Sequence, residues 1–153
     1  MRYLTLLLAA FGLTFFACKD KSLSPEEQLQ EDITQIDQYL KDKGLTAKST
    51  ASGLRYIITQ EGTGGNPSIQ STVTVRYKGY FLDGSVFDQT EGTKTIAFPL
   101  TNVIDGWQEC IPLLKASGKG TFLIPSGLCY GPEGKGSIPP NTPLAFDVEL
   151  VSF

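Results

Sequence analysis

The chain has 153 residues, of which 41% are hydrophobic and 19% charged, and this composition is typical of one globular domain with short extensions. Its 13 basic and 16 acidic residues give a net charge of -3, and no cluster of lysine and arginine resembles a phosphate-binding stretch, so we expect no nucleic acid partner. Histidine is absent, which excludes a His-based triad, a histidine general base and the commonest metal ligand, and we expect neither a metal site nor a cofactor.

The first seventeen residues are a predicted signal peptide, with Arg2 near the start, an apolar run, and the small residue Ala17 before Cys18. The apolar run is shorter than the roughly 20 residues that a membrane-spanning helix needs. Residues 15–18 resemble a bacterial lipobox, which predicts cleavage after Ala17 and a lipid on Cys18. The polar residues 19–22 suit a tether, although an unmodified Cys18 near an ordinary cleavage site is the alternative. We therefore expect an exported protein, lipid-anchored to a bacterial membrane and facing the periplasm or the cell surface.

A helix is predicted over residues 25–43. Ser24 offers an N-cap hydroxyl, Pro25 suits the first helical position, and Glu27 completes a capping box. Gly44 follows as a stop signal. One narrow stripe of apolar residues recurs at helical spacing: Leu29, Ile33, Ile36 and Leu40. The stripe suits a docked or loosely attached helix more than a dimer seam, so we expect a monomer or a weak dimer formed through this helix.

From Gly53 onward the apolar residues alternate, which predicts a change from helix to strands. The chain then divides into a signal peptide at 1–17, a lipidated tether, helix and linker at 18–52, and a domain at 53–153. Sixteen glycines and nine prolines favour a strand-rich fold with many turns. The clearest strand spans 72–82, and its alternation places these residues on one face: Val73, Val75, Tyr77, Gly79 and Phe81.

The remaining elements of the domain follow from turn and breaker residues. Asp83 and Gly84 predict a hairpin turn into a strand at 85–87. Further strands are predicted at 54–60, 95–98, 120–124 and 144–153. A short helix that begins near Ile104 should end by Pro112, because a residue before proline disfavours helical geometry. Residues 125–143 are too long for a passive connection, so we expect a functional loop there.

Three segments carry the functional signal in a fixed order. The first runs from Tyr77 to Asp88, and the second covers 103–107, Val-Ile-Asp-Gly-Trp. The third begins at Tyr130 and ends in Phe-Asp-Val-Glu-Leu at 146–150. Together they resemble the FKBP family of peptidyl-prolyl cis/trans isomerases over about residues 53–153. Three ordered segments are far more specific than one motif.

The resemblance implies an α+β fold, in which a twisted antiparallel β-sheet curls around one short α-helix, preceded here by the N-terminal helix. It implies isomerisation of X-Pro bonds in exported proteins, with proline-containing polypeptides as substrates and macrolide inhibitors as candidate ligands. The implied catalytic positions are Tyr77, Phe87, Asp88, Trp107, Tyr130 and Phe146. The implied substrate-binding positions are Ile96, Val103, Ile104 and Ile138. We expect Phe98, Phe122 and Leu150 to be ordinary core residues.

The sequence departs from the family pattern at several positions. Ile96 replaces an aromatic wall residue, and residues 89–95 lack the arginine that pairs with the family's equivalent of Asp88 in some members. Cys110 and Cys129 stand where the family often has small residues. A disulfide between them and two buried free thiols are both open alternatives, since nothing in the sequence fixes their distance.

Such a site needs no catalytic base. Rotation about an X-Pro bond breaks amide resonance against a barrier of roughly 18–20 kcal/mol, and no covalent bond changes. An apolar pocket that removes water would disfavour the planar amide more than the twisted transition state. The competing hypotheses are a non-enzymatic chaperone or binding module that uses the same cleft, and a surface lipoprotein that recognises outside ligands.

Overall fold

The computed structural model describes residues 23–153. The predicted signal peptide at 1–17 and the predicted lipid on Cys18 lie outside the described residues. Within residues 23–153, no helix combines the length and the apolar character that crossing a membrane requires.

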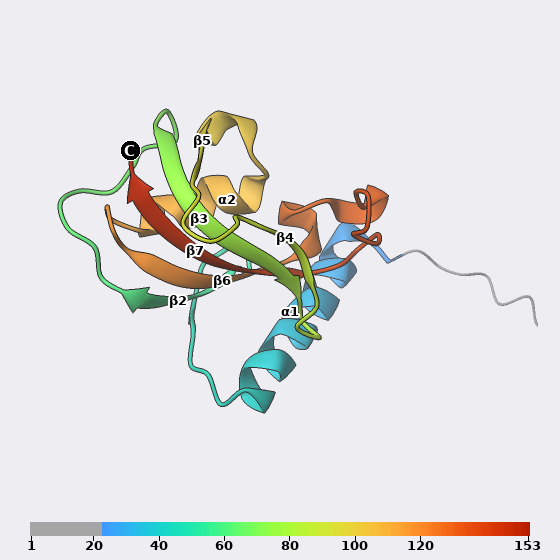
Figure 1. The fold of residues 1–153 in the computed structure, drawn as a ribbon. Helices are drawn as coiled ribbons and strands as arrows, with labels where there is room; N and C mark the ends of the chain where they lie inside the picture. The colour runs from blue at the N-terminus through green and yellow to red at the C-terminus, as the bar shows by residue number, and fades with distance from the viewer. Residues whose placement is uncertain (1–22) are drawn as a thin grey trace, which may run out of the picture.

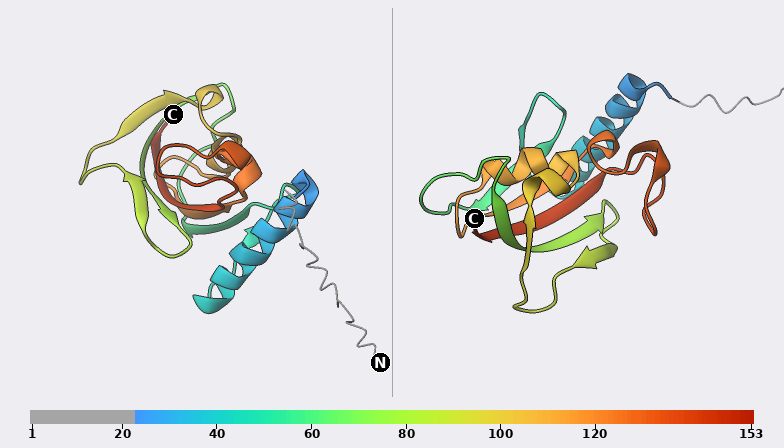
Figure 2. Two further views of the ribbon diagram at one scale, coloured as in Figure 1. Left: turned by 90° about the vertical axis from the view of Figure 1, so that its right-hand side faces the viewer. Right: turned by 90° about the horizontal axis from the view of Figure 1, so that it is seen from above.

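The described residues form one antiparallel sheet of seven strands and two α-helices (Figure 1). The helices are α1 (Pro25–Asp42) and α2 (Asp105–Cys110). The strands are β1 (Lys48–Ser49), β2 (Arg55–Gln60), β3 (Thr72–Phe81), β4 (Val86–Gln89), β5 (Ile96–Pro99), β6 (Lys119–Ile124) and β7 (Leu144–Ser152). Their order is β1-β2-β6-β7-β3-β4, and β5 also pairs with β3. The sheet curls around α2, while α1 lies outside the curve (Figure 2), and this confirms the α+β class.

Alternation along the central strands gives the sheet two different faces. In β3, Val73 and Val75 are fully buried in the main core, as the sequence pattern predicts. Gly79 of β3 lies opposite Phe146 of β7, which lies opposite Phe122 of β6, so these three positions share the inner face. One residue further along, Tyr80, Ala145 and Leu123 pair in the same way and point to the outer face. The helix α2 covers the inner face through Trp107 and Cys110, and Ile111 of the following 3-10 turn extends this cover.

The N-terminal helix docks on the outer face of the sheet. Ile36 is fully buried and Leu40 is 7% exposed, and both pack in a second cluster with Tyr80, Leu123 and Ala145. At the start of the helix the predicted capping box is present: the Glu27 N–H donates to Ser24 Oγ at 3.2 Å, and the Ser24 N–H donates to Glu27 Oε2 at 2.8 Å. The apolar stripe is therefore used within the chain.

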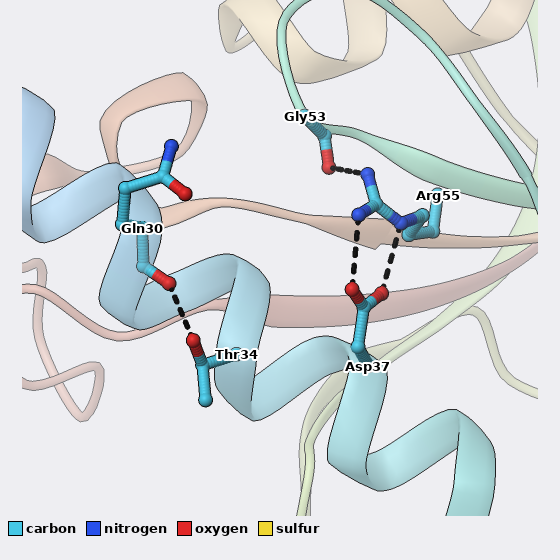
Figure 3. Close-up of polar contacts among 5 residues, drawn as sticks. All are labelled: Gln30, Thr34, Asp37, Gly53 and Arg55. Atoms are coloured by element: carbon cyan, nitrogen blue, oxygen red, sulfur yellow. Dashed lines mark hydrogen bonds and ion pairs between the residues drawn. The ribbon is translucent and has the colours of Figure 1, made fainter.

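An ion pair fastens the middle of α1 to the strand β2. The Arg55 guanidinium donates to both carboxylate oxygens of Asp37, at 2.9 and 3.1 Å, and to the Gly53 carbonyl at 2.9 Å (Figure 3). On the same helix the Thr34 hydroxyl donates to the Gln30 carbonyl at 2.8 Å. The Asp37 side chain is 51% exposed, so solvent screens this pair and its contribution to stability is small.

One local prediction differs from the structure, and one is confirmed. Residues 48–49 of the predicted linker form the short strand β1, which pairs with β2. The short helix α2 begins after Ile104 and ends at Cys110, as predicted, and a 3-10 turn at Ile111–Leu113 follows it, with Ile111 at φ -62° and ψ -39°. A proline is tolerated there because it stands in the first turn, where its missing N–H breaks no bond.

Candidate active site

A cavity of about 230 Å³ opens between α2 and the inner face of the sheet. Its walls come from β3, β4, β5, β7, the start of α2 and the loop at 125–143. The lining residues are Tyr77, Phe87, Asp88, Phe98, Asn102, Val103, Ile104, Trp107, Tyr130, Lys135 and Phe146. The cavity is therefore built from segments that lie far apart in the sequence.

Aromatic rings make the floor and two walls. Trp107, 5% exposed, meets the ring of Tyr77 edge to face at 5.2 Å and 86°, and that of Phe146 at 5.4 Å and 85°. Phe87 meets Phe146 at 5.7 Å and 87°. Edge-to-face pairs of this kind are favoured by the ring quadrupoles, and they fix each ring against its neighbour.

Gly79 lets two of these rings approach the sheet. A Cβ on Gly79 would lie 2.6 Å from Cζ of Phe87 and 2.9 Å from Cε1 of Phe146. Both distances are below normal van der Waals contact, so a side chain on β3 at this point would push the rings into the cavity. The glycine is a steric requirement of the site.

Two tyrosines and a carboxylate supply the polar part of the lining. The Tyr77 hydroxyl donates a hydrogen bond to Asp88, and burial together with that carboxylate raises the pKa of Tyr77. Burial also raises the pKa of Tyr130, whose ring lies 5.4 Å from the Lys135 ammonium. Both phenols therefore remain neutral donors at physiological pH.

The comparisons with known proteins agree with this geometry. Residues 64–151 match the family model of FKBP-type peptidyl-prolyl cis-trans isomerase. The chain belongs to the FKBP family. A probable FKBP-type isomerase FkpA of Neisseria meningitidis is 49% identical over 106 residues, 68% of this chain and 39% of that protein. The outer membrane protein MIP of Legionella longbeachae is 43% identical over 103 residues, 66% of this chain and 44% of that protein.

Solved FKBP structures resemble the chain over most of its length. A peptidyl-prolyl cis-trans isomerase from Pseudomonas syringae has a TM-score of 0.71 at 34% identity and covers 86% of this chain and 97% of its own. The FkpA structure from Escherichia coli has a TM-score of 0.72 at 31% identity, over 86% of this chain and 73% of its own. The chain spans about 40% of the length of the first curated relatives it matches.

Most of the residues carried over from the FKBP pattern line the cavity. All six predicted catalytic residues do so, as do Val103 and Ile104. Ile96 and Ile138 do not belong to the lining. Ile96, the first residue of β5, is 45% exposed. Ile138 of the loop is 7% exposed and packs into the core, and its N–H donates to the Lys135 carbonyl at 2.9 Å.

Three lining residues were not predicted from the sequence as site residues. Phe98 was expected to be ordinary core, yet it lines the cavity, with its ring 5.4 Å from Trp107. Phe98 lies two residues after Ile96 and so shares its strand face, which could have identified Phe98 from the sequence. In the structure Phe98 forms the wall that was assigned to Ile96 from the sequence. Asn102 and Lys135 stand on turns, and nothing in their spacing pointed to the site.

Asp88 is held by a neighbour in the same FKBP pocket. The absence of an arginine in residues 89–95 left its partner open, and the structure supplies the Tyr77 hydroxyl. Lys94, the one cation of that stretch, pairs with Glu91 at 2.8 Å instead. A neutral hydroxyl thus takes the place of a guanidinium.

The two cysteines of the domain are free thiols in the structure. Cys110 is fully buried in α2, and Cys129 lies in the loop with its Sγ 3.8 Å from the Ile124 carbonyl. Burial raises the pKa of both thiols, which favours their protonated form. Of the two alternatives left open by the sequence, the structure contains the pair of thiols.

The indole N–H of Trp107 is the buried polar side-chain atom without a hydrogen-bond partner among residues 23–153. Because this atom is not exposed to the cavity, the floor presents ring carbons to a bound peptide. The floor of the site is apolar, and the polar groups stand at its rim.

Proposed function

We propose that the chain catalyses cis/trans isomerisation of X-Pro bonds in exported polypeptides. The observation that carries the proposal is the ring-lined cavity over Trp107, formed where the FKBP segments converge. Family membership supports the activity, and the cavity contains the groups that this reaction needs without a proton-transfer residue.

The proposed mechanism begins with desolvation of the X-Pro amide. A planar amide has charge separated between oxygen and nitrogen, and twisting the C–N bond removes the resonance that separates it. Rings of Tyr77, Trp107 and Phe146 exclude water from the bound prolyl group, which disfavours the planar form more than the twisted one.

Hydrogen-bond donors at the rim then hold the peptide. The backbone N–H of Ile104, at the N-cap of α2, donates to no backbone carbonyl in the described part of the chain. Tyr130 lines the same cavity from the loop at 125–143, and its hydroxyl is the second proposed donor. Each donor fixes one acceptor of a turn-shaped peptide, and each contributes about 0.5–1.5 kcal/mol net.

A protease-coupled proline-peptide assay tests the proposal. We expect catalysis by the wild-type chain, inhibition by a macrolide ligand of FKBP pockets, and a partial loss of about two- to tenfold in Tyr130→Phe. Tyr56→Phe is the matched control, because Tyr56 packs against the same core and does not line the cavity.

The outcomes separate the competing hypotheses. A background rate with the wild-type chain, together with binding of unfolded protein, would favour the non-enzymatic chaperone or binding module that uses the same cleft. Abolished activity in a folded Tyr130→Phe variant would contradict a mechanism shared among several weak contacts.

We also propose that residues 1–17 direct export and that Cys18 carries a lipid. The support is the lipobox-like sequence and the resemblance to a protein named for the outer membrane. Labelling cells with a radioactive fatty acid should mark the wild-type chain and leave Cys18→Ser unlabelled. Label on Cys18→Ser would refute the assignment.

Because α1 buries Ile36 and Leu40 within the chain, we propose a monomer, which sedimentation at micromolar concentration can test.

A further inference from the structure

One charged side chain of the helix α1 is completely buried. Asp32 is 0% exposed, and it shares its environment with Ser126, which is 1% exposed. Removing a carboxylate from water is costly unless donors compensate its charge. A helix that only needed docking would satisfy this position with an apolar side chain, as it does at Ile36.

The donors to Asp32 come mainly from the active-site loop, residues 125–143. Both the N–H and the hydroxyl of Ser126 donate to Oδ2 of Asp32, at 2.7 and 2.6 Å, across 94 residues of sequence. The Gln28 amide donates to Oδ1 at 2.8 Å from within the helix. Charge-assisted bonds of this length are among the stronger hydrogen bonds in proteins.

Apolar packing between α1 and this loop is incomplete. A cavity of about 310 Å³ separates them, with Leu29, Pro125, Leu128 and Pro132 in its walls. Beside this space, the hydrogen bonds between Asp32 and Ser126 link the loop directly to the helix.

Backbone bonds connect Ser126 to the cavity-lining part of the loop. The Cys129 N–H donates to the Ser126 carbonyl at 2.9 Å, and the Gly134 N–H donates to the Tyr130 carbonyl at 3.1 Å. Tyr130 and Lys135 then line the site. A shift of Ser126 is therefore carried through one 3-10 turn to the Tyr130 hydroxyl.

We propose that Asp32 is a positioning residue for the active-site loop, so that α1 holds Tyr130 in its substrate-binding position. The helix lies outside residues 64–151, which match the FKBP family model, so this support is added to the domain from its N-terminal extension. The role of Asp32 in turnover rests on the proposed isomerase function, whereas its role in ordering the loop is independent of that function.

The test compares Asp32→Ala with Asp37→Asn in the full chain. Asp37 anchors the same helix to Arg55 of β2 and does not touch the loop (Figure 3). We measure kcat and KM for a proline peptide, amide hydrogen exchange of Cys129 and Gly134, and thermal unfolding.

In Asp32→Ala we expect KM to rise about fivefold with kcat changed less than about twofold, because a smaller fraction of the chains has the loop in its binding conformation. Exchange at Cys129 and Gly134 should accelerate in the same variant. Asp37→Asn should leave KM and loop exchange at wild-type values.

A conservative variant and a loop-side variant complete the design. In Asp32→Asn, the amide oxygen can still accept from Ser126, while Gln28 turns its amide to accept from the new NH2 group. We therefore expect KM to return close to the wild-type value. Ser126→Ala removes only the hydroxyl bond, and we expect a smaller change of KM in the same direction. This variant also decides the proposal if Asp32→Ala does not fold.

The proposal is overturned if loop exchange and KM in Asp32→Ala, or in Ser126→Ala, equal those of Asp37→Asn. A wild-type chain without isomerase activity would instead overturn the proposed function. Faster loop exchange in Asp32→Ala would then still support the positioning role, and unchanged exchange would exclude it.

Discussion

The two faces of the sheet are covered in different ways. On the inner face, α2 packs over large side chains such as Phe122 and Phe146, and the aromatic rings leave a cavity of about 230 Å³ at one edge. On the outer face, α1 packs over Tyr80, Leu123 and Ala145 in a small cluster. Beyond the helix, the outer face carries ion pairs such as Arg76 to Glu149 at 2.9 Å.

The two helices therefore have different roles on the two faces of the sheet. Rings held edge to face fix one another but do not fill the space between helix and sheet, so the inner face is both core and binding site. The apolar side chains of the outer cluster attach α1 to the sheet and do not line the binding cavity. Substitutions on the two faces should therefore have different consequences.

The largest effect is expected from the middle of the inner face. Phe122 is fully buried between β2 and β7, opposite Tyr56 and Phe146. Phe122→Ala should lower the free energy of unfolding by about 3–5 kcal/mol, because it removes buried ring area and leaves a cavity. Urea unfolding measures the change. A loss below about 1 kcal/mol would mean that the inner face is not one continuous core.

The outer face should give a smaller and more local effect. Ile36→Ala should cost about 2–4 kcal/mol at the helix contact. Amide exchange should accelerate in α1 and leave the centre of β7 protected, because the helix can detach without opening the sheet. Ile33→Ala, at a half-buried position of the same helix, is the control with the smaller loss. Equal acceleration in α1 and β7 would show that the two faces unfold together.

A substitution at Gly79 should separate activity from stability. In Gly79→Ala, the added methyl displaces the Phe87 and Phe146 rings into the cavity, at a cost in stability of about 1–3 kcal/mol. We expect isomerase activity to fall by at least about tenfold, since reacting groups misplaced by about 1 Å lose rate steeply. Gly65→Ala, where a Cβ meets nothing within 4 Å, is the control. Normal activity in Gly79→Ala would contradict the ring-lined site.

The last comparison is the dependence of stability on alkaline pH. Burial raises the pKa values of Cys110 and Cys129, and also those of Tyr77 on the inner face and Tyr80 on the outer face. Above the ordinary pKa values, the unfolded chain releases protons that the folded chain retains, so stability must fall as pH rises. The loss should begin near pH 9, the ordinary value of the thiols, and deepen above pH 10, that of the phenols.

Urea unfolding under reducing conditions from pH 7 to pH 11 measures this dependence. Tyr77→Phe and Tyr80→Phe each remove one shifted phenol, so each variant measures the share of the loss above pH 10 that its own phenol contributes, and Tyr130 contributes a further share. Stability that is constant or rises over this range would contradict the burial of these groups.

Local patterns in the sequence predicted much of the fold. The alternation of Val73 and Val75 identified the inner face of β3, and Ser24 with Glu27 identified the start of α1. Each of these signals depends on neighbours within a few residues. The FKBP resemblance brought distant residues such as Tyr77 and Tyr130 to one cavity, which no local pattern could do.

The remaining features depend on tertiary contacts. Ile96 and Phe98 share one strand face, and only the position of Trp107 decides that Phe98 forms the wall. The pairing of Asp32 with Ser126 joins positions 94 residues apart, and an acid on a polar helix gives no sign that it will be buried. Such contacts are fixed by how the helix meets the loop.

The place of β7 in the sheet has a consequence for biosynthesis. This strand carries Phe146, comes last among the strands, and lies between β6 and β3, so it contributes to both central pairings. Until residues 144–152 have been made, the two halves of the sheet have no strand to join them and the cavity has no Phe146 wall. The domain therefore folds as a late, non-local event. In a chain that is still being made, β3 and β6 would each lack the β7 partner on one edge until that strand inserts.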